Sequence, residues 1–441
     1  MPRTGVVASP ALGIELDFDR GFWAGEVISG RVVRNVQAVS PRAWVTLRLF
    51  GRTKVKVSVE RGSNNNRHTD IYRSRFDVLG SGPELGQALF DGVLHIPPGG
   101  SEAWQFALTL PVRPDAAAVL SGDVSQEYSF LALNPDVIAS GGLPFSFAYS
   151  QYHFDSFVEY VLEAQLVEQH GAKTKTTATA TRPVFMLPPP VPALLHPALH
   201  RAAVSHHTVH TQRLLPGMAD AELSFMERTR KLFHTSSVPK LNLRVEVEAP
   251  EALQLSSSGT SGRPAPPMSF RLRVVPRREQ SSPGLPLPGG GKRAGDDPDP
   301  DEVTISVVAL RLRITAWTEV AVRGASSYHR TKSPVARDVR ISWPEGGGVA
   351  VPCGDDVAPL DVGRAGALLF DAQSSYWRGA DMTPRGGSLF GGDEEVMYPD
   401  FVTYNIKHWH SMRWDVELTV AKETIKIRGE GPLVVVAPPP A

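Results

Sequence analysis

The sequence predicts an all-β protein built from two tandem β-sandwich domains, and three observations lead to this prediction. The chain has 441 residues, more than the roughly 250 to 300 at which a single core stops growing. An alternating strand pattern occurs twice, at residues 156–167 (SFVEYVLEAQLV) and 412–420 (MRWDVELTV). Each copy is followed by a polar turn, a further strand pattern and a run of prolines. Finally, 39 glycines and 38 prolines favour a turn-rich β chain over a helical one.

The two copies of the alternating pattern predict which residues face the two cores. Successive side chains of a strand point to opposite faces of the sheet, so residues two apart share a face. We expect the apolar set of each copy to be buried: Val158, Tyr160, Leu162, Ala164 and Leu166 in the first copy, and Trp414, Val416, Leu418 and Val420 in the second.

The first domain is predicted at residues 12–187. A turn at residues 23–26 leads into a strand at 27–33. The segment 46–60 (TLRLFGRTKVKVSVE) alternates apolar and charged residues on both sides of Gly51, which predicts a hairpin that turns at this glycine.

The later part of the first domain combines one clear strand with one long irregular segment. Residues 95–111 predict a turn and a strand, because Pro-Pro-Gly-Gly precedes alternating apolar residues that end at a proline. Residues 112–155 have no such period and exceed the usual loop length of compact domains. We interpret them as a functional insertion or a poorly ordered segment, and the sequence leaves both alternatives open.

A Pro-rich linker is predicted at residues 188–238, because proline lacks the backbone donor that a central strand needs. Within it, residues 220–234 predict one amphipathic helix with Asp220 as its N-cap. Two alternatives account for its apolar face: packing against a sandwich, which is favoured, or docking on a partner groove or membrane surface. The candidate contact residues are Phe225, Met226, Arg228, Arg230, Lys231, Leu232 and Phe233.

The second domain is predicted at residues 239–436. It opens with the alternating segment 240–248 (KLNLRVEVE), and further strand patterns follow up to the closing pair. The loops 256–267 and 279–302 are rich in Ser, Gly and Pro or in acidic residues. Such compositions bury too little apolar area to become ordered, so we expect both loops to be disordered.

Charge and cysteine content limit the partners and the compartment. Lys and Arg together number 46, as do Asp and Glu, so no global field attracts nucleic acid or anionic membrane. Cys353 is the single cysteine, whereas a secreted sandwich of this size usually contains disulfides, so the cytosol is expected. The neighbours of Cys353 are acidic, which favours an inert structural role. We also expect neither a signal peptide nor a membrane span.

The histidines favour neither a metal site nor a cofactor site. The linker histidines have no cysteine partner and no His-Glu-x-x-His helix, and we expect His408 and His410 to pack within a sheet. No nucleophile elbow or phosphate-binding loop is present, so we expect no enzymatic activity. The linker histidines are His196, His200, His206, His207 and His210.

Two groups of charged residues are candidates for functional sites. Glu159 and Glu163 share a strand face, and we interpret them as two solvated carboxylates, not as an acid–base pair. Arg52, Lys54 and Lys56 form a basic strand face without interleaved aromatic residues. This favours a solvated face over a nucleic-acid site.

Several segments resemble the arrestin family, and their order is more specific than any one of them. Residues 403–427 (TYNIKHWHSMRWDVELTVAKETIKI) are similar to the closing strands of an arrestin C-terminal domain in the style of fungal arrestin-like proteins. The resemblance implies two arrestin-like β-sandwiches joined by a short hinge. The segments that resemble the N-terminal domain are residues 25–32 (GEVISGRV), the charged segment 46–60, residues 97–111 (PPGGSEAWQFALTLP) and residues 158–166 (VEYVLEAQL).

The resemblance implies a non-enzymatic cytosolic adaptor that binds the cytosolic tails of membrane proteins. Such an adaptor links its cargo to endocytosis, sorting or ubiquitylation and is recruited peripherally to the plasma membrane or to endosomes. Many fungal arrestin-like proteins recruit a ubiquitin ligase through Pro-Pro-x-Tyr, and this motif is absent here. The run PPPVP at residues 188–192 fits an SH3-type partner, although a spacer is the favoured interpretation.

Two further functions remain as alternatives at this point. The first is a structural subunit of an endosomal sorting coat, like the arrestin-fold subunit of retromer. The second is a β-sandwich enzyme or a carbohydrate-binding module. Neither alternative is supported by a motif in the sequence.

Overall fold

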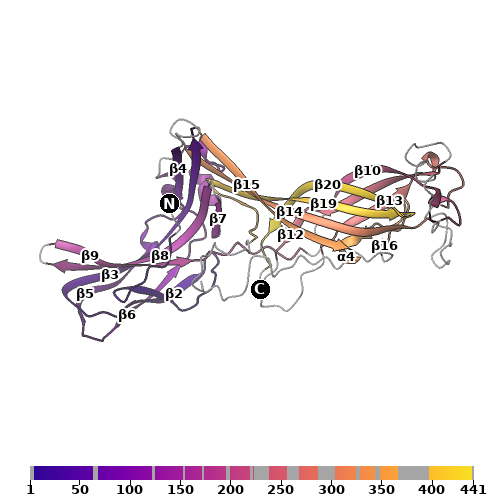
Figure 1. The fold of residues 1–441 in the computed structure, drawn as a ribbon. Coiled ribbons are helices and arrows are strands. Elements are labelled where there is room, and N and C mark those ends of the chain that lie inside the picture. The colour runs from indigo at the N-terminus through magenta and orange to yellow at the C-terminus, as the bar shows by residue number, and fades with distance from the viewer. Residues whose placement is uncertain are drawn as a thin grey trace.

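A computed structural model shows an elongated all-β molecule in which two β-sandwiches lie end to end (Figure 1). The predicted fold class, an all-β chain with two sandwich domains, is confirmed. The structure describes residues 4–62, 68–121, 125–151, 154–170, 173–194, 199–218, 222, 238–255, 268–286, 303–323, 328–342, 348–365 and 397–439.

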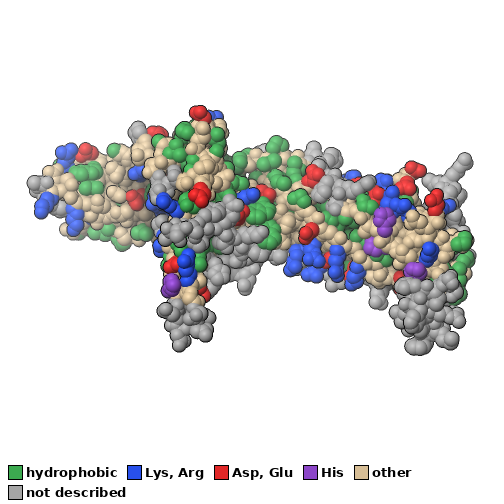
Figure 2. Space-filling view, turned by 90° about the horizontal axis from the view of Figure 1, so that it is seen from above, with side chains coloured by type: hydrophobic (Ala, Val, Ile, Leu, Met, Phe, Trp, Pro, Cys, Tyr) green, Lys and Arg blue, Asp and Glu red, His purple; other side chains and the backbone are tan. Residues whose placement is uncertain are grey.

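The surface of the molecule carries charges of both signs, in agreement with the equal numbers of basic and acidic residues. Figure 2 shows a row of Lys and Arg side chains on the second sandwich. Among its basic residues, Arg311, Arg313 and Arg413 are exposed on the outer face of the larger sheet. Positive charge therefore gathers in local patches of the surface.

The first sandwich consists of a three-stranded and a six-stranded sheet. The smaller sheet has the order β1–β2–β6, from β1 (Gly13–Leu16), β2 (Val27–Arg34) and β6 (Glu102–Thr109). The larger sheet has the order β4–β3–β8–β7, with β5 also paired to β3 and β9 also paired to β8. Its strands are β3 (Ala38–Arg61), β4 (His68–Asp77), β5 (Gly86–Ile96), β7 (Phe147–Gln151), β8 (Phe154–His170) and β9 (Lys173–Val184).

The segment with no strand period, residues 112–155, contains short helices in its described part. Asp115 caps the first of them by accepting hydrogen bonds from the amides of Ala117 and Ala118, and Asn134 caps a later one. The short helices of the first sandwich are η1 (Pro83–Leu85), α1 (Ala116–Leu120), η2 (Gln126–Tyr128) and α2 (Pro135–Ser140).

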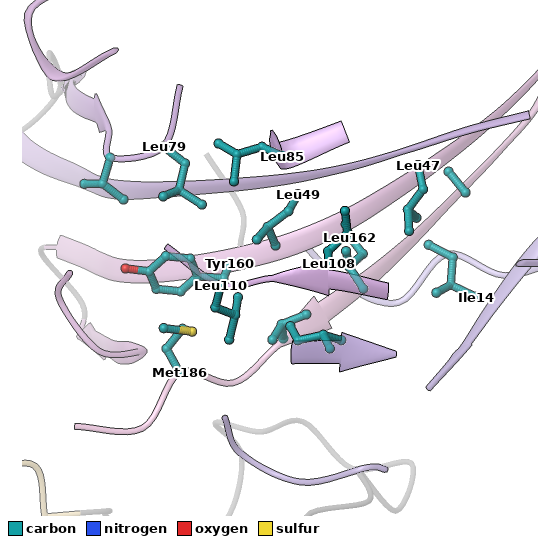
Figure 3. Packing of buried hydrophobic residues seen from close by; sticks show 14 of the residues in the cluster. Ile14, Leu47, Leu49, Leu79, Leu85, Leu108, Leu110, Tyr160, Leu162 and Met186 are labelled. Atoms are coloured by element: carbon teal, nitrogen blue, oxygen red, sulfur yellow. The ribbon is translucent and has the colours of Figure 1, made fainter. Parts of the chain in front are cut away.

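The hairpin predicted around Gly51 is wrong, because β3 runs straight through this glycine as one long strand. Gly51 pairs with Tyr160 of β8, and a Cβ at this position would lie 2.6 Å from the Tyr160 ring. The glycine therefore makes room for an aromatic side chain in the core and does not form a turn. Figure 3 shows Tyr160 and Leu162 among the core leucines.

The second sandwich consists of a four-stranded and a seven-stranded sheet. The smaller has the order β10–β11–β13–β17, and the larger has the order β12–β20–β19–β14–β15 with β16 and β18 attached. Its short helices are η3 (Gln212–Leu214), η4 (Arg278–Gln280) and α4 (Val362–Ala365). Its strands are β10 (Leu199–His210), β11 (Lys240–Pro250), β12 (Ala252–Gln254), β13 (Arg271–Pro276), β14 (Ile305–Arg323), β15 (Tyr328–Ser342), β16 (Val349–Ala350), β17 (Leu360–Asp361), β18 (Phe401–Val402), β19 (Ile406–Val420) and β20 (Glu423–Val436).

Two predictions about irregular segments need correction. The predicted linker 188–238 contains β10, which pairs with β11 along its whole length and so belongs to the second sandwich. The predicted disordered loop 279–302 begins with ordered residues, because the hydroxyls of Ser281 and Ser282 accept hydrogen bonds from backbone amides of β11. The rest of that loop, from residue 287, and the whole loop 256–267 lie outside the described residues.

The predicted core residues of both alternating segments are buried. Each has an exposed fraction of 1% or less in the structure. Tyr160 and Trp414 each lie opposite a glycine of the neighbouring strand, Gly51 and Gly429 respectively. The repeat in the sequence therefore corresponds to the same packing device in both sandwiches.

The two sandwiches share an aromatic junction at the near ends of β14 and β19. Tyr404 stacks on Phe76 of β4 with ring centroids 5.2 Å apart, and Phe147 of β7 packs against Phe401 at 4.7 Å. The side-chain amide of Asn405 donates a hydrogen bond to the Ser74 hydroxyl. Side chains from the second half of the chain thus complete the core of the first sandwich.

Candidate functional site

The outer face of the six-stranded sheet places like charges directly opposite one another on β3 and β4. Lys54 is opposite Arg75, and Lys56 is opposite Arg73. Like charges at directly opposite positions of a sheet destabilise it. We refer to these four residues as the basic strand pair. Their arrangement favours an anionic partner for this face.

Strand β4 is also the edge of its sheet. It pairs with β3 on one side, and no other described strand pairs with its second side. The Arg73 side chain is exposed and forms no hydrogen bond or ion pair with another described side chain, whereas Arg75 bonds Asp77 at 2.7 Å. The edge therefore combines open backbone groups with exposed positive charge.

Glu159 of β8 lies buried beside this face and is held by three neighbours. Its carboxylate is 2.6 Å from Lys54 Nζ and 2.7 Å from Arg52 Nε. The backbone amide of Thr4 donates a third hydrogen bond at 2.9 Å. The Glu159 side chain is 3% exposed and that of Lys54 is 5% exposed, so two opposite charges are removed from water together.

Burial and ion pairing act in opposite directions on the Glu159 carboxyl. Burial by itself raises the pKa of Glu159, but the hydrogen bonds from Lys54, Thr4 and Arg52 outweigh it, and the pKa lies below its ordinary value. Burial lowers the pKa of Lys54, and the positive charges of Arg52 and Arg75 add to this, against the bond to Glu159. Glu159 therefore offsets part of the clustered positive charge, as do Asp155, 3.6 Å from Lys56, and Asp77 beside Arg75.

The predicted solvated faces are wrong at two positions. Glu159 was expected to be a solvated carboxylate and Lys54 a solvated base, yet both are buried. The reason is that the N-terminal segment covers this face: Val7 pairs with Thr181 of β9, and Thr4 reaches Glu159. Lys56 and Glu163 are partly exposed. Chemically, the arrangement can bind an anionic group at the rim, beside Lys56 and Arg73.

Sequence reasoning did not identify Arg73 and Arg75. The signal was present in the segment 71–77 (IYRSRFD), where the two arginines are two residues apart and therefore share a face. What the sequence did not reveal is that this face adjoins Lys54 and Lys56. That neighbourhood depends on the pairing of β4 with β3.

His408 and His410 pack within β19 at the domain junction, as predicted. His408 Nδ1 shares a 2.9 Å hydrogen bond with the Thr318 hydroxyl, and His410 Nδ1 donates to Asp400 at 2.6 Å. Burial, and secondarily the nearby His410, lower the pKa of His408 well below its ordinary value. His408 is therefore neutral near pH 7.

The linker histidines within the described part of the chain lie on β10. His207 Nε2 is 2.9 Å from the Ser205 hydroxyl, and His206 Nε2 is 3.3 Å from Arg277. No group of three His, Cys, Asp or Glu side chains among the described residues is arranged to bind a metal ion. His196 lies outside the described residues.

The predicted linker helix cannot be placed, because residues 223–237 lie outside the described residues. This applies to all of its candidate contacts: Phe225, Met226, Arg228, Arg230, Lys231, Leu232 and Phe233. Their packing or docking role stays a prediction.

Cys353 is buried in the second sandwich, and its thiol donates a hydrogen bond to the Val351 carbonyl. Its backbone also pairs with Val274 of β13. The Cys353 side chain is therefore packed inside the second sandwich. Its chemical inertness stays a prediction.

A comparison of the sequence with models of protein families finds no match. A comparison with curated protein sequences finds none either. Among the described helices, none has the length and the apolar character required to cross a membrane.

Proposed function

We propose that the protein is a non-enzymatic, arrestin-like cytosolic adaptor. In this proposal it binds the cytosolic tails of membrane proteins and links them to endocytosis, sorting or ubiquitylation at the plasma membrane or endosomes. The observation that supports it best is the open edge of β4 beside the basic strand pair. The order of the arrestin-like segments supports the same class of function.

The chemistry of this edge suits an extended acidic segment. An extended peptide adds to an open sheet edge through main-chain hydrogen bonds, and its alternate side chains face one side of the sheet. Acidic residues at alternate positions would face Arg73 and Arg75 and relieve the repulsion along the basic strand pair. Cytosolic tails without a fold of their own present such segments readily.

A binding experiment with a defined probe tests this proposal. The probe is a fluorescent 12-residue peptide with glutamate at alternate positions and valine or threonine between them, titrated with the full chain in an anisotropy assay. The double variant Arg73→Glu/Arg75→Glu should lose about tenfold or more in affinity, because attraction becomes repulsion. The matched control, Lys173→Glu/Lys175→Glu on the exposed part of β9, should bind like the original chain.

Two results would contradict the proposed site. One is equal loss of affinity in both charge-reversal variants, which would indicate a general electrostatic effect. The other is binding of an alternating lysine peptide with the same affinity as the acidic probe.

Proximity labelling in cells separates the adaptor from the sorting-coat alternative. An adaptor should label varied membrane proteins, and Arg73→Glu/Arg75→Glu should remove that labelling. A fixed set of partners in constant stoichiometry, unchanged by the double variant, would favour the coat subunit.

A further inference from the structure

In the proline run that follows the first sandwich, every third residue is buried or half-buried. Pro188 is buried, and Val191 and Leu194 are half-buried. The two residues after Pro188 and the two after Val191 are all exposed: Pro189, Pro190, Pro192 and Ala193. A strand would show a period of two, whereas three residues per turn is the period of a polyproline II helix.

Hydrogen bonds occur on the buried edge of this helix. The amide of Val191 donates to the Pro438 carbonyl, so the linker run lies beside the C-terminal proline run. The side-chain amide of Gln254 donates to the carbonyls of Val191 and Pro192 and also to that of Ala437. Its oxygen accepts from the amide of Leu194. Gln254 of β12 thus connects the two proline runs.

This anchoring determines which sides of the helix are accessible. A polyproline II helix has three edges, and in residues 188–194 the side chains of one edge are covered by the protein, while Pro192 contacts Gln254 through its carbonyl alone. The second edge contains Pro189 and Pro192, and the third contains Pro190 and Ala193. Domains that recognise such helices dock proline edges into grooves lined by aromatic side chains.

We propose that residues 188–194 are a pre-ordered docking ligand for a domain with an aromatic-lined, polyproline-binding groove. Pro189 and Pro192 are the contact residues of the i, i+3 edge, and Pro190 supports them from the next edge. Because Gln254 orders the run before the partner arrives, binding loses less conformational entropy than binding of a free peptide. This role goes beyond the proposed tail binding, and it does not depend on the basic strand pair.

The test uses the full chain and a panel of purified SH3, WW and EVH1 domains immobilised for surface plasmon resonance. At least one class of domain should bind with a Kd below about 1 mM, a weak affinity typical of short ligands. Pro189→Ala/Pro192→Ala should lose about tenfold or more, because the contact edge is removed. The matched control is Pro97→Ala/Pro98→Ala, an exposed proline pair in a turn of the first sandwich, and its binding should not change.

Pre-ordering is tested separately by Gln254→Ala and by a synthetic peptide of residues 186–195. Both should bind the same domain several-fold more weakly than the original chain, because each must order the run on binding. Arg73→Glu/Arg75→Glu should bind like the original chain, so failure here and failure of tail binding are distinguishable.

Three results would overturn the inference. The first is no binding by any domain of the panel, and the second is unchanged binding by Pro189→Ala/Pro192→Ala. The third is an equal loss in the Pro97→Ala/Pro98→Ala control. Equal affinity of the free peptide and the full chain would overturn the role of Gln254. Thermal unfolding of each variant confirms that the compared chains are folded.

Discussion

Strands β8 and β19 have the same pattern in the sequence, but their outer faces differ. Their inner faces are equivalent: Tyr160 and Trp414 are buried opposite glycines in both sandwiches. On the outer face, Glu159 of β8 is buried within an ion network, whereas Glu417 of β19 forms a partly exposed pair with Lys426. Strand period therefore determines only which face of each strand enters the core. The second face depends on whichever segment covers it.

The largest expected effect comes from removing the buried charge of β8. Glu159→Gln should lower the free energy of unfolding by about 3 to 5 kcal/mol, because it leaves Lys54 buried without its anion. The equivalent change on β19, Glu417→Gln, should cost less than about 1 kcal/mol. Chemical denaturation of both variants measures the difference.

A second substitution separates charge from packing in this prediction. Lys54→Met in the Glu159→Gln background should recover much of the loss, because the more deeply buried of the two cations beside Glu159 is removed and only the partly exposed Arg52 remains. Failure of the double variant to recover stability would assign the loss to packing.

The next effect tests the similarity of the two strands. Gly51→Ala and Gly429→Ala should each destabilise the protein by about 1 to 3 kcal/mol, because the added Cβ meets the Tyr160 ring or the Trp414 ring. Relief by Tyr160→Leu in the first case and Trp414→Leu in the second would identify the aromatic ring as the cause. A marked effect in one sandwich alone would contradict the equivalence of the inner faces.

The free energy of unfolding should depend on pH in a different range for each strand, through His408 on β19 and Glu159 on β8. The folded-state pKa of His408 is lowered, so the unfolded chain takes up a proton first as the pH falls below about 6.5. The free energy of unfolding should therefore fall by up to about 1.4 kcal/mol per pH unit in that range. The pKa of Glu159 is also lowered, so its contribution is lost at lower pH, beginning below about 4.5.

Stability measured against pH checks this order of events. His408→Phe should reduce the slope just below pH 6.5 and leave the slope below pH 4.5, and Glu159→Gln should do the reverse. Part of the first slope should remain in His408→Phe, because burial also lowers the pKa of His207. The neighbours of His408 are Thr318, His410 and the aromatic rings of the junction, while Asp400 bonds His410. An undiminished slope in His408→Phe would mean that groups other than His408 account for the titration in this range.

The smallest effect is expected on the outer face of β19. Lys426→Ala removes an exposed ion pair with Glu417 and should change the free energy of unfolding by less than about 1 kcal/mol. The change should shrink further in high salt, because exposed pairs are screened. A larger or salt-independent effect would show that this face is covered, as that of β8 is.

The sequence predicted the elements of the fold better than their connections. Alternation identified the long strands and their buried residues, because burial on one face leaves a period of two in the chain. It failed at Gly51, because a glycine inside a strand and a glycine in a turn look alike until Tyr160 is placed opposite it. It also assigned β10 to the linker, because the prolines near it outweighed a short polar strand pattern.

The sequence predicted some residues of the candidate site but not their surroundings. Arg52, Lys54, Lys56 and Glu159 were recognised as charged strand residues, but their burial was not. Lys54 and Glu159 are far apart in the chain and meet through the pairing of β3 with β8. The proline run was also recognised, whereas its anchoring by Gln254 was not.

The all-β class, the two sandwich domains and the inner face of each long strand could be predicted from the sequence. The reason is local: periodicity and proline position act on neighbouring residues of the chain. Only the tertiary structure shows that Glu159 is buried, that the second side of β4 pairs with no other described strand, and that one edge of the proline run is covered. These properties depend on contacts between distant segments, because desolvation and hydrogen bonding are set by whatever lies nearby in space.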